Sequence, residues 1–406
     1  MNDGVEALIN RQMIILARKQ SGLDEEAAAK KISVSIEKFK SWEDGLSRPT
    51  INQAIKMAEV YHRPLSYFYL REAPKDFTVA ITDFRRTREG VPPKMSPALF
   101  LEQRRAEMRR EVMLELTENQ DDLLFEHFNT ITLNENPEKI ADQIRNWLGI
   151  SWNAQKQWRE TTVALSVWRR SIEDLNVLVC HTSHQGLKVD LAECRGFSLS
   201  VPYCPVIVMN SSDSYGGRIF TLLHEFAHIL LNKGGICNLE QYSNIQNTEQ
   251  RVEIYCNHVA GSVLVPEGLL KSHAIVERHN RNLEWDDEEI YNLSVDFSTS
   301  EEVIVRRLLI LGIVTQEFYE MKRRHYGIRW GEIKEKKKQK KSKGGPPQYR
   351  MAVRQNGRIF TQQVFSSYHE NQMNLLDVAD VLGVRMKHLK AIEQEAYFGG
   401  KGGQDE

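Results

Sequence analysis

The stretch of sequence that decides the fold is Thr221-Leu222-Leu223-His224-Glu225-Phe226-Ala227-His228-Ile229-Leu230-Leu231. His224 and His228 are one helical turn apart, so on a helix their imidazoles lie on one face and can bind one metal ion. The other side chains make this helix apolar nearly all round, which is typical of a helix buried inside a domain. Buried histidine and glutamate side chains need a partner that satisfies them. The stretch therefore predicts a zinc site.

The residue between the two histidines has the position of a general base. Glu225 lies about 100° around the helix from His224, too far round to be a third ligand but close enough to reach a water beside the metal. A hydrolytic zinc site takes three protein ligands, and Glu253 is the best candidate for the third. It opens a second apolar run of helical spacing that stops at Pro266. Glu249, one turn earlier, is a rival third ligand.

Two residues after Glu253 have supporting or open roles. Asn257 is one turn beyond Glu253, where it can accept a hydrogen bond from the far nitrogen of a ligating histidine. His258 is about 140° around the helix from Glu253, which favours a surface or supporting position over a ligand. Two other interpretations stay open: structural histidines bonded to backbone, and a degenerate site that binds zinc without cleaving.

Two sequence segments resemble the ImmA/IrrE family of zinc metallopeptidases: Arg218 to Leu231 and Glu253 to Pro266. The family pattern is R-x-F-T-L-x-H-E-x-x-H-x-L-L followed by E-x-x-[AC]-N-x-x-A-x-x-x-L-x-P. The resemblance extends through 168–170, 195–197 and 205–210. It implies that His224, His228 and Glu253 bind zinc, that Glu225 is the catalytic base, and that the substrate is a regulatory protein, often a DNA-binding repressor.

Length and composition bound the class of protein. A chain of 406 residues suggests two or three domains. A hydrophobic content of 41% and a formal net charge of -1 describe a soluble globular protein and demand neither nucleic acid nor membrane. The first residues carry no signal pattern, and no apolar run approaches the roughly 20 residues that span a bilayer. We therefore expect a cytoplasmic protein, with its five cysteines reduced and in the core.

The segment from Leu23 to Phe68 resembles the helix-turn-helix of the Xre/Cro repressor class, most clearly between Ser33 and Ile51. Docking as in that class places the third helix in the major groove, with contacts from Ser35, Ile36, Lys38, Lys40 and, beyond the helix, Arg48. Carboxylates at 24–26 would repel a phosphate backbone, and the segment is nearly neutral. DNA binding and protein docking both remain open for this fold.

The expected fold class is α+β and mostly helical, with four parts. They are a five-helix Xre-type domain (1–72), a thermolysin-like zinc peptidase domain with a small β-sheet (75–330), a lysine-rich linker (331–347) and a small C-terminal α/β domain of unknown role (348–406). Pro74 to Thr87 is interpreted as a connection. A long amphipathic helix is expected at 97–128, and further helices at 140–147 and 158–176.

Short runs rich in β-branched residues predict strands at 177–180, 196–199 and 206–209. The last of them is interpreted as an edge strand that holds an extended peptide beside the metal helix. His181 and His184, on the turn after the first strand, are interpreted as surface residues. Residues 293–311 have a sequence pattern like that of a helix-turn-helix. The pattern resembles the helical segment that ends the peptidase unit in the ImmA/IrrE family.

The function predicted from the sequence is a zinc-dependent endopeptidase that cleaves a regulatory protein such as a repressor or an antitoxin. Zn²⁺ is the expected cofactor, and Glu225 takes a proton from water and passes it to the leaving amine. The alternative is a DNA-binding transcription regulator or antitoxin with a non-cleaving zinc fold. Double-stranded DNA and a second copy of the chain stay open as partners; a membrane is not expected. Tyr255, His258 or a remote His or Arg stay open as the oxyanion-stabilising group.

Overall fold

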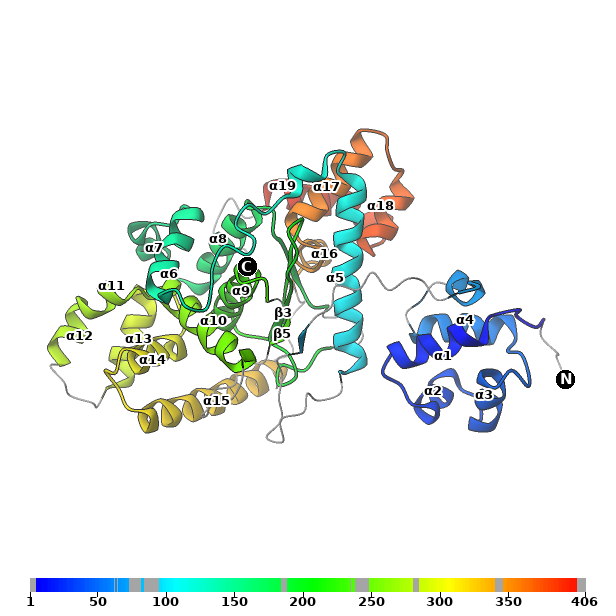
Figure 1. Cartoon of the computed structure of the whole chain (residues 1–406), viewed down its shortest axis with the longest axis horizontal. Helices are drawn as coiled ribbons and strands as arrows, with labels where there is room; N and C mark the ends of the chain where they lie inside the picture. The colour runs from blue at the N-terminus through cyan, green and yellow to red at the C-terminus, as the bar shows by residue number, and fades with distance from the viewer. Residues whose placement is uncertain are drawn as a thin grey trace. The chain divides into compact units, whose positions relative to one another are not determined.

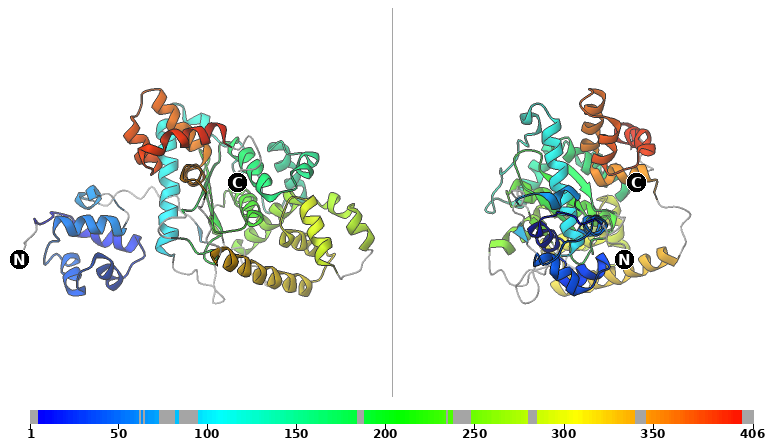
Figure 2. Two further views of the ribbon diagram at one scale, coloured as in Figure 1. Left: turned by 180° about the vertical axis from the view of Figure 1, so that it is seen from behind. Right: turned by 90° about the vertical axis from the view of Figure 1, so that its right-hand side faces the viewer.

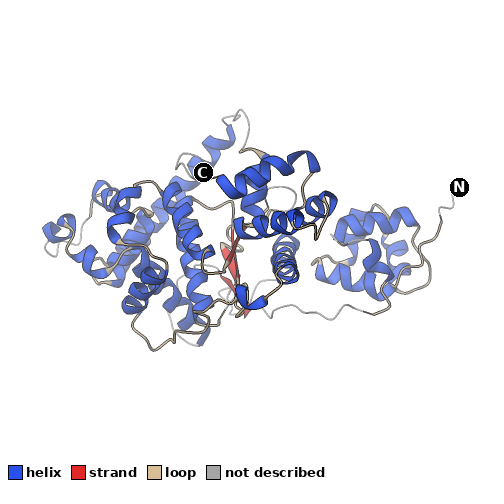
Figure 3. Cartoon of the chain, turned by 90° about the horizontal axis from the view of Figure 1, so that it is seen from above, coloured by secondary structure: helices blue, strands red, loops and turns tan. Residues whose placement is uncertain are grey.

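A computed structural model describes residues 5–61, 63, 65–72, 82–83, 95–183, 188–233, 235–237, 248–279, 285–339 and 346–399. The chain divides into two compact units, one of residues 1–80, 86–107 and 183–189 and the other of residues 81–85, 108–182 and 190–406. Most of the described residues are helical, and the strands form one small sheet (Figures 1 and 3). This agrees with the predicted α+β, mostly helical class.

The first unit contains the segment with the repressor-like sequence. Its elements are α1 (Arg11–Gln20), α2 (Glu25–Ile32), α3 (Ile36–Glu43), α4 (Ile51–Tyr61) and η1 (Leu65–Tyr69). Five helical elements are therefore present, although the fifth is a 3-10 helix. The side chains of Asn10, Asp24 and Ser35 cap the first three helices by accepting a backbone N–H. Phe39, Trp42 and Phe68 fill the core between the helices.

The second unit is built mainly from helices. In chain order they are α5 (Pro97–Leu116, which begins in the first unit), η2 (Gln120–Leu123), α6 (Pro137–Trp147), α7 (Trp152–Trp158), α8 (Thr161–Glu173), α9 (Tyr215–Leu230), α10 (Thr248–Leu264), α11 (Glu267–Lys271), α12 (Ala274–His279), α13 (Asp287–Asp296), α14 (Glu301–Ile310) and α15 (Gln316–Gln339). The C-terminal helices are α16 (Gln348–Asn356), α17 (Arg358–His369), α18 (Leu375–Leu382), η3 (Met386–His388) and α19 (Leu389–Phe398).

Two predicted helices differ from the structure. The helix expected at 97–128 ends at Leu116, because Asn119 caps the new turn of η2 and the N–H of Phe125 then donates to the carbonyl of Pro202 at 2.9 Å. The helix expected at 158–176 is interrupted at its start, where Arg159 adopts φ 54° between α7 and α8. The helix-turn-helix-like rhythm at 293–311 corresponds to the end of α13, a turn and α14.

The sheet has the strand order β1-β5-β3-β4-β2. Its strands are β1 (Thr82–Asp83), β2 (Leu178–His181), β3 (Gly196–Leu199), β4 (Val206–Met209) and β5 (Gly235–Cys237). The predicted bounds of β3 and β4 are confirmed, whereas β1 and β5 were not predicted. The prediction that 206–209 is an edge strand is wrong: β4 pairs with β2 on one side and with β3 on the other, so it has no free edge for a peptide.

The strand β2 reaches one residue further than predicted, and this changes the place of His181. The histidine is the last of four buried strand residues and is 3% exposed, so its interpretation as a surface residue is wrong. His184 lies outside the described residues, as does the 74–87 connection apart from β1. Cys180, Cys194, Cys204 and Cys256 are buried free thiols, as expected.

The C-terminal segment is helical, not α/β. All its elements between residues 346 and 399 are helices, which gather in one cluster in both views of Figure 2. Phe360, Val364 and Phe365 are aromatic or β-branched, which favours a strand, but they are buried at helical spacing on one face of α17. The predicted linker at 331–347 is also partly wrong, because α15 continues to Gln339. Lysine, glutamate and glutamine are good helix formers; residues 340–345 lie outside the described part.

The core of the second unit forms around α9 and α10. Every residue of α9 from Arg218 to Leu230 is buried, as its nearly uniform apolar sequence predicted. The helix packs against α8, α10, β3 and β4. Ser214 caps its N-terminus by accepting the N–H of Gly217 at 3.0 Å. The helix with the two histidines is therefore held on all sides.

Candidate metal centre

The structure brings the three predicted metal ligands together. His224 and His228 project from α9 and Glu253 from α10. The Nε2 atoms of the two histidines are 3.0 Å apart. Glu253 places Oε1 3.1 Å from Nε2 of His228 and Oε2 3.5 Å from Nε2 of His224. The ligand atoms lie within 4.8 Å of one another, and all three residues are buried.

The charges of this cluster fit a bound cation. Burial alone would raise the pKa of Glu253, but the two imidazoles hold it well below its usual range. Burial lowers the pKa of His228, yet Cys256 and Glu253 raise it more, so that it lies well above its ordinary value. Two imidazole nitrogens that face each other in a dry site need a shared proton or a metal. Two nitrogens and one carboxylate are a donor set that suits zinc.

Hydrogen bonds fix the orientation of the two candidate histidine ligands only in part. Nδ1 of His228 donates to the backbone carbonyl of Lys233 at 2.9 Å, which leaves Nε2 with its lone pair toward the cluster. Nδ1 of His224 and Oδ1 of Asn257 are both buried, and neither has a hydrogen-bond partner in the described part of the chain. The proposed support of a histidine by Asn257 therefore stays a prediction.

Glu225, the predicted base, is held by a residue that the sequence did not reveal. Ser198 of β3 donates its hydroxyl to Oε2 of Glu225 at 2.8 Å. Both side chains are fully buried. Burial raises the pKa of Glu225, against the lowering effect of the two histidines and of Ser198. The only available signal for Ser198 was a small polar residue within a short apolar strand.

We expect Ser198→Ala to weaken any reaction that depends on Glu225. Loss of one hydrogen bond to a charged group costs about 1.5 kcal/mol, which is roughly tenfold in rate. Zinc content should not change, because Ser198 contacts no candidate ligand in the cluster. Ser200→Ala is the matched control, since its hydroxyl faces the carbonyl of Ile229 and not Glu225. Equal cleavage rates of the two variants would exclude the positioning role of Ser198.

The close approach of β3 to α9 depends on a glycine. A Cβ atom at Gly196 would overlap the methyl group of Thr221 and lie 2.9 Å from the carbonyl oxygen of Val208. Only glycine therefore lets the strand pass near enough for Ser198 to reach Glu225. This close approach is a physical reason for the glycine in the segment Arg195-Gly196-Phe197, which is part of the family resemblance.

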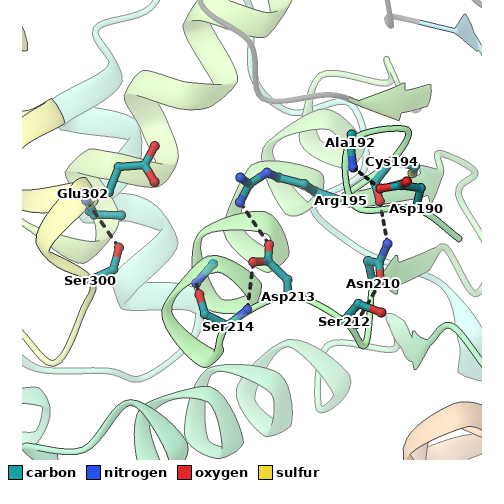
Figure 4. A network of polar contacts seen from close by, with 12 residues as sticks. Asp190, Ala192, Cys194, Arg195, Asn210, Ser212, Asp213, Ser214, Ser300 and Glu302 are labelled. Atoms are coloured by element: carbon teal, nitrogen blue, oxygen red, sulfur yellow. Dashed lines mark hydrogen bonds and ion pairs between the residues drawn. The ribbon is translucent and has the colours of Figure 1, made fainter. Parts of the chain in front are cut away.

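A polar network fixes the loop before α9 (Figure 4). Asn210 donates from Nδ2 to the carbonyl of Cys194 at 2.8 Å. Asp213 accepts from Arg195 at 3.1 Å and from the N–H of Ser214 at 2.8 Å. A cavity of about 380 Å³ adjoins this network, lined partly by Tyr326 of α15. The network sets the start of the histidine-bearing helix relative to the sheet.

The helix that carries Glu253 is anchored at its C-terminal end. Its last carbonyls lack helical partners, and three buried side chains supply them. Arg145 donates to the carbonyl of Val263 at 2.7 Å and Gln155 to that of Leu264 at 2.9 Å. Arg307 donates to the next carbonyl, that of Val265, at 2.9 Å. The position of Glu253 against α9 therefore depends on contacts from α6, α7 and α14.

Glu138 of α6 joins the same anchor. It lies 2.8 Å from Arg307, accepts the hydroxyl of Ser262 at 2.8 Å and is 3.2 Å from Nε2 of His258. His258 thus faces α6 and not the metal cluster. Burial raises the pKa of Glu138, but His258, Arg307 and Ser262 together lower it to about 2.

We expect this low pKa to appear as pH-dependent stability. A carboxylate whose pKa falls from 4.5 to about 2 on folding stabilises the fold above pH 4.5, and the gain is lost as pH falls toward 2. Because the side chain is 22% exposed, we discount for screening and expect Glu138→Gln to cost about 2 kcal/mol at pH 7. Urea unfolding should show that the difference in unfolding free energy between wild type and Glu138→Gln becomes smaller as pH falls from 4.5 to 2. A difference that does not change with pH would contradict the prediction. The control is Glu277→Gln, because Glu277 is exposed.

The residues predicted to contact DNA lie at the start of α3 and beyond it. Ser35 caps the helix by accepting the N–H of Lys38 at 3.3 Å, and the Lys38 side chain is exposed. Ile36 is partly buried, and Arg48 is exposed. Lys40 is 3.3 Å from Glu25 of α2, so one predicted phosphate contact already has a carboxylate partner. The geometry leaves DNA binding by this segment a prediction.

The geometry of the cluster can now be compared with known families. Residues 172–309 match a family model, the IrrE N-terminal-like domain of M78 peptidases. This IrrE-like domain runs from the end of α8 into α14 and contains all three candidate ligands, Glu225 and Ser198. The match supports the resemblance to ImmA/IrrE proteins and a metallopeptidase-type function. No curated protein gives a sequence match to the chain. Among the described helices, none is long and apolar enough to cross a membrane.

Proposed function

We propose that the chain is a zinc-dependent endopeptidase. The observation that carries the proposal is the buried cluster of His224, His228 and Glu253 with Glu225 on the same helix, inside an IrrE-like domain. The three ligand side chains would hold the ion. Zinc bound by them supplies Lewis-acid chemistry, which polarises a peptide carbonyl and makes water easier to deprotonate.

The protein's own part in the reaction is proton transfer. Glu225 takes a proton from water and delivers it to the leaving amine, so that one carboxylate acts as base and then as acid. Its dry surroundings raise its pKa, which makes it a stronger base than an exposed glutamate. Ser198 keeps the carboxylate in one orientation through these steps.

The proposed substrate is a DNA-binding regulatory protein. This choice rests on the ImmA/IrrE resemblance, together with the repressor-like segment in the first unit. That segment would bring the peptidase to DNA or to a protein of the same class. The proposed setting is therefore proteolytic control of transcription, including control of a repressor or antitoxin, inside the cytoplasm.

A second candidate function is a DNA-binding regulator whose zinc fold does not cleave. The observation that favours it is burial: His224, His228 and Glu225 have no exposed surface, so a peptide reaches them only after a rearrangement. In this case the zinc cluster would be structural. The presence of Glu225, for which a structural site has no need, favours the peptidase.

The experiment that decides between them combines metal content with cleavage. Wild type and Glu225→Gln are purified, their zinc is measured, and each is incubated with the DNA-binding proteins encoded beside its gene. The proposal expects one zinc in both proteins and a defined cleavage product with wild type alone. Zinc in both proteins with no product from any of these substrates favours the non-cleaving regulator, and protein without zinc contradicts both functions.

A further inference from the structure

The last helices of the chain repeat the geometry of the repressor-like segment, 350 positions later in the sequence. Both α2 and α18 have eight residues, Glu25–Ile32 and Leu375–Leu382. Each begins at a side-chain cap, Asp24 in one case and Asn374 in the other. Each is followed by a three-residue turn and a second helical segment, α3 in the first unit and η3 with α19 in the second.

The turns between the helices have the same backbone conformation. Ser33 has φ 66° and ψ 46°, and Gly383 has φ 64° and ψ 37°. The next residue in each turn is a valine whose N–H donates back into the first helix. Val34 donates to the carbonyl of Ala29 at 3.0 Å, and Val384 donates to that of Ala379 at 2.9 Å. This left-handed turn fixes the direction of the second helix in both segments.

The buried positions also correspond. The core side chains of the first pair are those of Ala28, Ala29, Ile32, Phe39 and Trp42, and 350 positions later those of Val378, Ala379, Leu382, Leu389 and Ile392 are buried as well. Few of the paired residues are identical, so the similarity is one of pattern and geometry. A helix-turn-helix is defined by such a pair of helices, with its second helix free to enter the major groove.

We propose that residues 374–398 form a second helix-turn-helix that binds double-stranded DNA. The start of its second helical segment carries three exposed cations, Arg385, Lys387 and Lys390, and none of them has an ion-pair partner within the described residues. Positions Ser35 and Lys38 of the first segment correspond to Arg385 and His388 here. The C-terminal segment therefore presents more positive charge at the position that meets bases and phosphates.

The acidic residues of this segment are engaged or placed elsewhere. Asp377 accepts the N–H of Asn374 in the capping box of α18. Glu393 pairs with His369 at 2.5 Å, and Glu395 lies 3.6 Å from Arg350. Asp380, on the outer face of α18, is exposed. The cations at 385–390 therefore have no carboxylate partner among the described residues, and the exposed Asp380 lies on the other helix of the pair.

The segment is also a stable platform. Asn356 donates to the carbonyl of Leu382 at 2.9 Å, which satisfies the end of α18. The helix α19 packs against α16 and α17. Leu389, Ile392 and Ala396 form the buried face of α19, whereas Lys390 is exposed. Arg385, which precedes η3, and Lys387 of η3 are exposed as well.

The test measures DNA binding by the full chain. The probe is a fluorescent 30-base-pair duplex pool of random sequence, titrated by anisotropy at several salt concentrations from low to physiological. One variant combines Arg385→Ala, Lys387→Ala and Lys390→Ala. We expect its affinity at low salt to fall by at least about tenfold, and the slope of log affinity against log salt to decrease by about 2 to 3.

Three comparisons make the outcome decisive. The control variant combines Lys139→Ala, Lys156→Ala and Arg278→Ala, which removes the same charge from exposed positions elsewhere. It should bind as wild type does. A third variant carries Lys38→Ala, Lys40→Ala and Arg48→Ala in the first segment. Any DNA binding that this variant retains should be lost when Arg385→Ala, Lys387→Ala and Lys390→Ala are added to it. Thermal unfolding must be unchanged in all variants.

Two results would overturn the second DNA-binding segment. The first is a C-terminal triple variant that binds the duplex with the affinity and the salt dependence of wild type. This result would assign all DNA binding to other residues. The other is the absence of duplex binding by wild type at low salt, including the case where only single-stranded nucleic acid or protein is bound. Neither result bears on the peptidase, since zinc content and cleavage are measured separately.

Discussion

We expect Glu253→Gln to bind zinc at least roughly 100-fold more weakly than wild type, because loss of a ligand costs more than loss of the groups that orient ligands. The carboxylate of Glu253 is the only negative group of the described cluster in contact with both imidazoles. A glutamine of the same shape cannot balance the charge of the ion. Zinc content after dialysis against a graded series of chelator concentrations measures the effect.

The rival ligand supplies the control for this prediction. Glu249 lies one turn earlier on α10 but is not part of the metal-binding group formed by His224, His228 and Glu253. Glu249→Gln should therefore keep wild-type zinc affinity. Loss of zinc in Glu249→Gln with retention in Glu253→Gln would reverse the assignment. Loss in both with normal unfolding curves would point to a larger acidic site around α10.

The cluster could be predicted from the sequence because helical spacing fixes it. Two histidines one turn apart must share a face of α9, and Glu253 lies in the first half of the next long helix, α10. A different local signal placed β3 and β4, namely short runs with clear limits. Each of these predictions depends on residues near one another in the chain.

The contacts that the sequence did not reveal join distant segments. Ser198 reaches Glu225 across the β3–α9 interface, and the carbonyl of Lys233 holds His228 through a backbone atom that carries no sequence signal. The inner position of β4 depends on its pairing with β2, which no local pattern encodes. The helical tail was misread because aromatic and β-branched residues favour strands until packing decides otherwise.

The repeated helix pair at the C-terminus shows the same limit. Ser33 and Gly383 adopt one backbone conformation, although serine gives no turn signal as clear as that of glycine. The buried aromatic pair of the first segment is replaced by Leu389 and Ile392. The buried positions are kept while the size and identity of the side chains change, so the similarity is clear in the structure and weak in the sequence.

The second large effect that we expect is the loss of stability in Gly357→Ala. Gly357 joins α16 to α17 with φ 86° and ψ 146°, a conformation that is essentially limited to glycine. A Cβ atom there would lie 2.7 Å from Cδ1 of Leu178 and 3.0 Å from the carbonyl oxygen of Val179. Both contacts are with β2, an edge strand of the sheet. Strain and overlap together should cost about 3 kcal/mol or more.

This cost would be concentrated where the C-terminal helices cover the sheet. Arg358 forms an ion pair with the buried Glu173 at 3.1 Å. On the other side of Gly357, Oδ1 of Asn356 accepts a hydrogen bond from Nε of Arg109 at 2.9 Å. Both neighbours of Gly357 are therefore fixed. The backbone cannot shift to make room without breaking these bonds. Chemical unfolding and limited proteolysis should therefore show a less stable protein that is cut first between α15 and α19. Gly331→Ala, in a helical position with nothing within 4 Å, should be neutral or slightly stabilising. Equal stability of the two variants would mean that the C-terminal helices are not docked on β2 as described.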